Sequence, residues 1–331
     1  MRVVIEAPLL VSAQLAKHPL ALLELFNLCL DQECHTLEIE PPEAPALKLW
    51  TDTLTPAQRD EIDLILDASV ERQLRDPPMS VVRVADVEDA EWEGTVPRLP
   101  LRGAIALLRK PLRVLIEGIN DEAFLHATVP HFYRARFEDW SKRELLKVEH
   151  RGGLQNLHHA LEQECQVRER RLRLFVLFDS DARKRGEPHP ESRKVARFCE
   201  RKTLTHHQLQ RRAIDNYVPP PALERWLKRN HSREFDGKWL PRLQSFRLLT
   251  EEQRHHYNMK RGLRGDREGS GLADIFARFI DEKPDQAALL EEGFSPAVAE
   301  SFQERIPDAW LAQDGQTPEL MQLFEKLLRA A

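Results

Sequence analysis

Three acidic residues stand where two apolar segments of the chain end. Glu117 closes the segment LRVLIE at 112–117, and Asp179 and Asp181 follow LRLFVLF at 172–178. Short, nearly continuous apolar segments are typical of buried parallel strands, whose carboxyl ends line the ligand crevice of an α/β sheet. Carboxylates that are brought together repel one another unless a cation neutralises them, and magnesium prefers hard oxygen ligands of this kind. The spacing therefore predicts a divalent-metal site at one edge of a sheet.

The elements that must position these acids alternate along the chain. Strands are predicted at 112–117, 145–149, 172–178 and 203–209, and helices at 120–128, 154–168 and 191–201. Strands that alternate with helices indicate a parallel sheet with crossover helices, so the predicted fold class is α/β. Asp179 and Asp181 can converge if the strand continues, because residues two apart on a strand project to the same side.

The rest of the chain predicts two further regions, which suits a length of 331 residues. Residues 1–100 have the pattern of a small α/β domain that ends in an acidic, proline-bearing linker at 86–100. Residues 108–220 hold the predicted parallel sheet with the acids. After three consecutive prolines, residues 221–331 become mainly helical. Helical spacing is found at 221–229, 249–260, 270–282, 285–292, 295–304 and 317–330.

Composition narrows the class of protein. Hydrophobic residues make up 41% and charged residues 31% of the chain, as in a globular protein. The net charge of -5 does not mark a nucleic-acid binder, so such a role would depend on local basic patches. No apolar segment approaches the ~20 residues that span a bilayer, and Glu6 interrupts the segment where a signal peptide would be apolar. We therefore expect a soluble, cytoplasmic protein without membrane contact.

Four segments, in this order, resemble the motifs of the Toprim domain. VLIEGINDEAFL at 114–125 is similar to the first motif, in which a strand ends in Glu-Gly and an Asp-Glu opens a helix, and FVLFDSDAR at 175–183 is similar to the DxD strand. VEHRGGLQNL at 148–157 and RRAIDNYVP at 211–219 resemble two segments of the nuclease branch. The resemblance is closest to nucleases of the OLD family (overcoming lysogenization defect) and to stand-alone Toprim nucleases of bacterial anti-phage systems.

The resemblance implies a metal-ligating role for the acids of the first two motifs. Glu117 would ligate the metal or act as the base that positions the attacking water. Asp179 and Asp181 would hold one or two magnesium ions, for which manganese could substitute. Asp121 would ligate as well, or would orient another ligand. Two metal ions can stabilise the attacking and leaving oxygens of an in-line phosphodiester displacement.

Two further residues are implied by the later segments. Asp215 would complete the ligands of a second ion, although the family usually has the longer Glu at this position. Lys260 lies in HHYNMKRGLRGD at 255–266, which resembles the segment that supplies a lysine near the scissile phosphate, with Arg261 as a substitute. A structural helix start for Asp215 and a solvated position for Lys260 are the open alternatives.

Glycines and basic residues near the acids could contact the phosphates of a nucleic acid. Gly152 and Gly153 form a sharp turn beside the predicted sheet edge, which could admit a phosphate or could be a plain tight turn. Basic residues flank the acids in sequence, so contact with a phosphate backbone is physically reasonable. The candidates are Arg183, Lys184, Arg185, Arg211 and Arg212.

The leading hypothesis is a magnesium-dependent endonuclease for DNA or RNA, acting as the effector of a bacterial anti-phage defence system. Such effectors are often paired with an ATPase, which would be a separate protein because the chain has no GxxxxGK[ST] segment. The alternative is a non-catalytic, Toprim-like nucleic-acid-binding or scaffold subunit, and a phosphotransferase or primase-like enzyme is a third hypothesis. The C-terminal helices suit a homo-oligomer, a docked partner or packing on the chain's own core.

Overall fold

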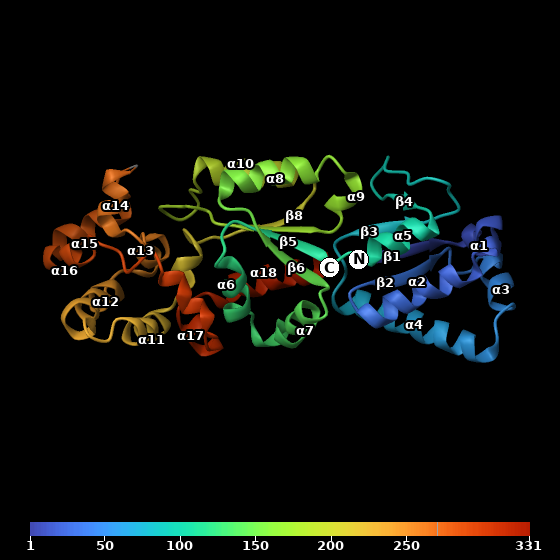
Figure 1. Ribbon diagram of the computed structural model, residues 1–331, viewed down its shortest axis with the longest axis horizontal. Helices are drawn as coiled ribbons and strands as arrows, with labels where there is room; N and C mark the ends of the chain where they lie inside the picture. The colour runs from blue at the N-terminus through green and yellow to red at the C-terminus, as the bar shows by residue number, and fades with distance from the viewer. Residues whose placement is uncertain (270) are drawn as a thin grey trace.

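The strands form two separate parallel sheets. The computed structural model describes residues 1–269 and 271–331. The sheets have the orders β2-β1-β3-β4 and β6-β5-β7-β8, and all neighbouring strands within them are parallel. The strands are β1 (Arg2–Glu6), β2 (Thr36–Glu40), β3 (Val81–Val84), β4 (Arg98–Leu99), β5 (Leu112–Ile116), β6 (Leu146–His150), β7 (Leu174–Phe178) and β8 (Thr205–Gln208). Helices flank both sheets (Figure 1), which confirms the predicted α/β class.

The first sheet and its helices form an N-terminal domain with its own hydrophobic core. Val3, Val82 and Leu37 of three neighbouring strands are buried there together with residues of α2 and α5. Thr55 caps the start of helix α4, since its hydroxyl accepts a hydrogen bond from the Gln58 amide. The helices are η1 (Ala7–Val11, 3-10), α1 (Ala13–Lys17), α2 (Pro19–Gln32), α3 (Pro45–Thr51), α4 (Pro56–Arg75) and α5 (Leu101–Leu108).

Helices cover both faces of the second sheet, here termed the central sheet. Leu115 and Val176 lie in one cluster with α8 and α10, whereas Val114 and Phe175 lie in another with α6, α7 and α18. The two groups alternate because neighbouring side chains on a strand point to opposite faces. The helices are α6 (Asp121–Thr128), α7 (His131–Lys142), α8 (Leu154–Glu164), α9 (Arg168–Arg171) and α10 (Pro190–Arg201).

Several elements of these domains were not predicted from the sequence, among them β2 and α7. In β2, Leu37 and Ile39 are buried, but acids alternate with them and the strand has only five residues. Helix α7 is rich in charged residues, and only Tyr133, Phe137 and Trp140 are buried along it. In both elements burial against the rest of the fold outweighs a weak local signal.

The chain after β8 forms a helical lobe and then returns to the central sheet. Helix α18 (Thr317–Ala330), red in Figure 1, packs against β7, β8 and α7. One continuous hydrophobic core joins the lobe to this face of the sheet, so the C-terminal helix packs on the chain's own core. The other elements are η2 (Ile214–Tyr217, 3-10), α11 (Pro220–Asn230), η3 (Phe235–Trp239, π), α12 (Leu240–Arg247), α13 (Glu251–His256), α14 (Gly262–Glu268), η4 (Asp274–Phe276, 3-10), α15 (Ala277–Glu282), α16 (Pro284–Leu289), η5 (Val298–Gln303, 3-10) and α17 (Asp308–Gln313).

Some C-terminal segments are less regular than predicted. Of the helix predicted at 270–282, Ser270 lies outside the described residues, and the 3-10 turn η4 precedes the short α15. The segment predicted as helical at 295–304 forms the 3-10 helix η5. Within the described ranges, none of the helices is long and apolar enough to cross a membrane.

The N-terminal domain contacts the end of α18 where the two chain ends meet (Figure 1). The Met1 amino group donates hydrogen bonds to the carbonyl oxygens of Cys34 at 2.8 Å and Ala331 at 3.2 Å. The Met79 amide donates to the Arg329 carbonyl at 3.0 Å. The last turn of α18 therefore contacts the N-terminal domain while the rest of this helix packs on the central sheet.

Helix α18 should contribute strongly to the stability of the central core. Phe324 is fully buried, and its ring meets that of Phe137 edge to face at 5.3 Å. We expect Phe324→Ala to destabilise the protein by about 3–5 kcal/mol, because truncation of a buried aromatic side chain leaves a cavity. Urea unfolding followed by circular dichroism measures the loss. Gln322→Ala, on the exposed side of the same helix, should shift the midpoint little, and equal losses would contradict the packing.

Candidate functional site

The acids of the first two motifs meet where the strand order of the central sheet reverses. Strand β5 pairs with β6 on one side and with β7 on the other, and Glu117 and Asp179 directly follow β5 and β7. The Asp179 amide donates a hydrogen bond to Glu117 Oε2 at 3.3 Å. Open α/β sheets bind ligands at such a switch point, because the loops on either side leave in opposite directions and open a crevice.

The turn after β5 places Asp121 in the same crevice. The Gly118 amide donates a hydrogen bond to Asp121 Oδ2 at 2.9 Å. A Cβ atom at Gly118 would lie 3.1 Å from Asp121 Oδ1, so the absence of a side chain permits this close approach. Asp121 also opens α6, where a negative charge is favourable at the helix N-terminus. The buried Asp121 carboxylate is thus fixed beside the end of β5.

Asp181 reaches the crevice through a turn rather than through a continued strand. Strand β7 ends at Phe178, and Asp181 adopts the left-handed conformation with a φ of 49°. Its amide donates to the Arg212 carbonyl at 2.8 Å, which holds the turn in place. The expectation that Asp179 and Asp181 project alike from one strand is therefore wrong in its geometry. A non-glycine residue in this conformation is uncommon and costs energy, as is often found near functional sites.

The remaining members of the site come from the segment after β8 and from the helical lobe. The Ile214 amide donates to Asp179 Oδ1 at 3.1 Å. The next residue, Asp215, is buried, and its Oδ2 lies 2.9 Å from Lys260 Nζ. Its other oxygen, Oδ1, is also buried and accepts no hydrogen bond from the described residues. Asp215 thus keeps one carboxylate oxygen for a further ligand.

The charges of these residues act on one another. Burial, followed by the charges of Asp181 and Asp121, raises the pKa of Glu117 to about 7. Burial raises the pKa of Asp121 to about 6. The pKa of Asp179 lies well above its ordinary value because of burial and then of the four other carboxylates. Burial also raises the pKa of Asp181 and Asp215. Lys260 opposes the rise at these two acids and at Glu117 and Asp121. The five acids therefore form one electrostatic cluster, although they lie far apart in the sequence.

The chemistry of this cluster fits a hard divalent cation. The acids offer only carboxylate oxygens, which magnesium and manganese accept readily, and a cation would relieve their repulsion. In residues 1–269 and 271–331, no three His, Cys, Asp or Glu side chains are arranged so that they could hold a metal ion. Asp121 and Asp215 instead face the Gly118 amide and Lys260. Glu117, Asp179 and Asp181 remain the candidates for holding an ion.

A close crossing of two backbone segments, 259–264 and 290–294, positions Lys260. The hydrogen bonds run from the amides of Leu263, Arg264 and Phe294 to the carbonyls of Leu290, Glu291 and Met259, at 3.0, 3.0 and 2.7 Å. A Cβ atom at Gly293 would lie 2.4 Å from the Lys260 carbonyl carbon, and one at Gly262 would lie 2.4 Å from a carbonyl oxygen of the other segment. Glycine is therefore required at both positions. This crossing was not predicted from the sequence.

The glycine turn predicted to contact phosphate lies beside Glu117. The amides of Gly152 and Gly153 donate to the Glu117 carbonyl at 2.9 and 3.1 Å. Their φ angles of 74° and 108° explain why glycine stands at both positions. These amides are committed to the protein, so the turn supports the end of β5 and a phosphate contact through its amides is excluded.

The predicted basic contacts divide into two groups. Arg183, Lys184 and Arg185 follow the DxD motif on a loop, where each is partly or fully exposed. Arg211 and Arg212 instead pair at 2.7 Å with buried acids of the C-terminal region. A phosphate-binding role is therefore wrong for Arg211 and unsupported for Arg212, because these guanidinium groups are already paired inside the protein.

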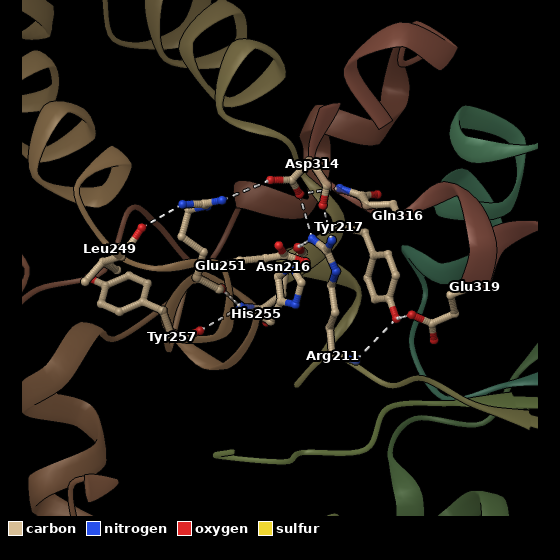
Figure 2. A network of polar contacts seen from close by, with 11 residues as sticks. Arg211, Asn216, Tyr217, Leu249, Glu251, His255, Tyr257, Asp314, Gln316 and Glu319 are labelled. Carbon is tan, nitrogen blue, oxygen red and sulfur yellow. Dashed lines mark hydrogen bonds and ion pairs between the residues drawn. The ribbon is translucent and has the colours of Figure 1, made fainter. Parts of the chain in front are cut away.

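A buried polar network holds the segment that carries Asp215 (Figure 2). The Arg211 guanidinium donates to Asp314 Oδ2 at 2.7 Å and lies 5.0 Å from the centre of the Tyr217 ring. The Tyr217 hydroxyl donates to Glu319 Oε2 at 2.5 Å. Glu319 belongs to α18, so residues 211–217 are tied to the C-terminal helix. The motif that resembles the nuclease branch thus serves as a scaffold for Asp215.

Two residues near the acids were missed by the sequence analysis. The Ser192 hydroxyl donates to the Asp179 carbonyl at 2.6 Å. Burial raises the pKa of Asp181, and the charges of Arg212 and, more weakly, of His189 just before α10 oppose this rise. The segment His-Pro-Glu-Ser is recognisable as a helix start, but nothing in it indicates that this start lies at the acidic crevice.

Loss of one partner from the Arg211–Asp314 pair should destabilise the protein strongly. Both side chains are buried, so removal of either leaves an uncompensated charge. We expect Arg211→Ala and Asp314→Ala each to cost about 3–5 kcal/mol, and the double variant to cost less than their sum. Urea unfolding measures the coupling. The exposed pair Arg278–Glu282 is the control, with a coupling of about 0–1 kcal/mol; equal couplings would contradict the network.

Comparisons with known proteins identify no relative of this chain. No protein-family model, no curated protein and no solved structure matches the chain. A functional conclusion must therefore be drawn from the chemistry and geometry of the acidic crevice and its surroundings.

Proposed function

We propose that the chain is a magnesium-dependent endonuclease that hydrolyses phosphodiester bonds of DNA or RNA. The observation that carries the proposal is the cluster of five carboxyl groups and one lysine at the switch point of the central sheet. The carboxyl groups raise one another's pKa, so the charged cluster is unfavourable without a counter-ion. This favours the binding of a cation. The resemblance of four ordered motifs to Toprim nucleases gives the reaction class.

The side chains suit distinct roles in phosphodiester hydrolysis. Magnesium, when bound, would polarise the scissile phosphate and lower the pKa of an attacking water. Asp179 and Asp181 would hold the ion, with Asp121 and Asp215 at the periphery. Glu117 would accept a proton from the water, because a carboxylate with a pKa of about 7 is an effective base near neutral pH. Lys260 would stabilise the negative charge that develops on the phosphate.

The surface beside the crevice favours a polyanionic substrate. Segment 182–202 contains eight Lys or Arg residues and three Glu residues, a balance of +5 in a chain of net charge -5. Arg185, Arg193 and Arg197 of this segment are exposed. A local basic surface of this kind attracts the phosphate backbone without reading its sequence.

The biological setting is part of the proposal and rests on the resemblance. Toprim nucleases of this type act as effectors in bacterial anti-phage defence, and we propose the same role for this chain in the cytoplasm. An ATPase that controls it would be a separate protein. Self-association into a homo-oligomer is compatible with this role but has no particular support from the contacts described above.

A non-catalytic, nucleic-acid-binding subunit is the second candidate. It is favoured by the ion pair of Asp215 with Lys260, in which the lysine already compensates one carboxylate. In such a protein the remaining acids would hold a structural ion, and cleavage would be absent. The two candidates share the metal site and differ in catalysis, so separate measurements distinguish them.

The buried charge of Glu117 should destabilise the metal-free protein above neutral pH. The pKa of Glu117 is raised in the folded protein, so this group contributes stability at low pH that is lost as pH rises from its unfolded value of about 4.3 through about 7. Without metal at pH 8, Glu117→Gln should therefore increase the free energy of unfolding by on the order of 1 kcal/mol or more, which a thermal melt detects as a higher melting temperature.

Magnesium should stabilise the wild-type protein at pH 8, by about 2.7 kcal/mol at 100 times its Kd. Glu117→Gln and Asp179→Asn should lose most of this gain in a thermal-shift titration. The exposed neighbour Glu122 provides a matched control, since Glu122→Gln removes one acid from the same turn without touching the crevice. An undiminished gain in Glu117→Gln would exclude the proposed site.

Catalysis is tested by incubating the purified protein with plasmid, single-stranded DNA and tRNA. We expect cleavage with magnesium or manganese, none with EDTA, and a loss of at least about 100-fold in Glu117→Gln, Asp179→Asn and Lys260→Ala. Glu122→Gln should cleave like the wild type. Cleavage that survives EDTA would contradict the mechanism. Metal binding without cleavage of any substrate would favour the non-catalytic candidate.

A further inference from the structure

A basic cavity of about 400 Å³ lies in the helical lobe next to the acidic crevice. Its wall is formed by parts of segments 231–242, 260–268 and 292–296. Five Lys or Arg residues and two Glu residues line it, a balance of +3 that reverses the sign of the whole chain. The cationic residues are Lys238, Arg242, Lys260, Arg261 and Arg264. This concentration of positive charge indicates an anionic ligand.

Arg242 supports the cavity wall and is not free to bind a ligand. Arg242 is buried and donates to the carbonyl oxygens of Leu289 at 2.9 Å and Gly293 at 2.5 Å. It also lies over the Trp239 ring, 5.2 Å from its centre. Trp239 is itself buried, so it lacks a free face on which a base could stack. The wall therefore offers charge rather than an aromatic platform.

Three other cations are available to a ligand. The side chains of Lys238, Arg261 and Arg264 are 49%, 64% and 56% exposed. Among the described residues, their acidic partners are surface glutamates, at N–O distances of 4.0, 3.4 and 3.2 Å. Exposed ion pairs of this length contribute little to stability, so each cation can exchange its partner for a phosphate.

Lys260 connects the cavity to the acids. The residue lines the cavity, and its Nζ lies 2.9 Å from Asp215 Oδ2 in the crevice. The glycine crossing at Gly293 and Gly262 fixes the Lys260 backbone within the cavity wall. A phosphate held in the cavity is therefore a neighbour of a phosphate held at the acids, with Lys260 between them.

We propose that this cavity binds the phosphate backbone of a single nucleic-acid strand on one side of the scissile bond. This inference rests on the proposed nuclease function and names its substrate class. The volume is at the lower end for ligand pockets, which span about 300–1,000 Å³, and so suits one flexible strand rather than a duplex. Because the contacts are to phosphates, binding is independent of base sequence. The substrate is a single-stranded DNA or RNA with nucleotides on that side.

The test measures binding of a fluorescent single-stranded 12-mer by anisotropy, as DNA and as RNA. The full-length protein carries Asp179→Asn, which prevents cleavage. In this background the variant Lys238→Glu/Arg264→Glu reverses two cavity charges. The control Arg278→Glu/Lys283→Glu makes the same change of net charge on the same lobe but outside the cavity. The DNA and RNA arms show which strand is preferred.

We expect the cavity variant to bind at least ten-fold more weakly than the control, which should bind within about three-fold of its parent. The slope of log K against log salt should fall by about 1 to 2, since each lost phosphate contact contributes about 0.7. Equal affinity of the cavity variant and the control would overturn the proposal. So would equal binding of a duplex, or displacement of the 12-mer by a mononucleotide or inorganic phosphate of equal affinity.

These readouts do not require hydrolysis. If the wild type cleaves nothing but the cavity variant alone loses the strand, the strand site stands and the nuclease proposal fails. If the wild type cleaves and is stabilised by magnesium, but the cavity variant binds the strand as tightly as the control does, the nuclease proposal stands and the strand site fails.

Discussion

Repulsion among five carboxyl groups at the switch point of the central sheet is the constraint that the rest of the structure must satisfy. Main-chain amides hold these groups in place, with the Asp179 amide on Glu117, the Ile214 amide on Asp179 and the Gly118 amide on Asp121. Lys260 is the built-in cation. The repulsion lowers the free energy of unfolding of the metal-free protein. A bound cation that neutralises the carboxylates would therefore stabilise the fold.

The helical lobe, which provides Lys260, is joined to the central sheet by extensive buried contacts. It shares one hydrophobic core with the central sheet. Arg211, Tyr217 and α18 join in a buried polar network that anchors the Asp215 segment (Figure 2). The crossing at Gly293 then fixes the Lys260 backbone. Precise placement matters here, because electrostatic stabilisation of a reacting group depends on groups that are already oriented.

The distribution of charge accounts for a net negative chain that would act on a polyanion. The acids are gathered in a half-buried crevice, while the loop after the DxD motif and the cavity of the helical lobe are basic. A phosphate backbone would meet positive charge on both sides and negative charge only where a metal can intervene. This division is local, which is why the total charge carries little information about the substrate.

Local pattern was enough to predict the α/β class, the strands of the central sheet and the acids at their ends. Apolar strands of fixed period end at Glu117 and Asp179, and parallel strands bring their carboxyl ends to one edge. Strand β2 and helix α7 escaped prediction, since their apolar residues are few and interrupted by charge. The role of Arg211 depended on Asp314, 103 residues away, and the place of Lys260 on a crossing with residues 290–294. Periodicity is a property of neighbouring residues, whereas buried charge pairs and backbone crossings exist only between segments that folding brings together.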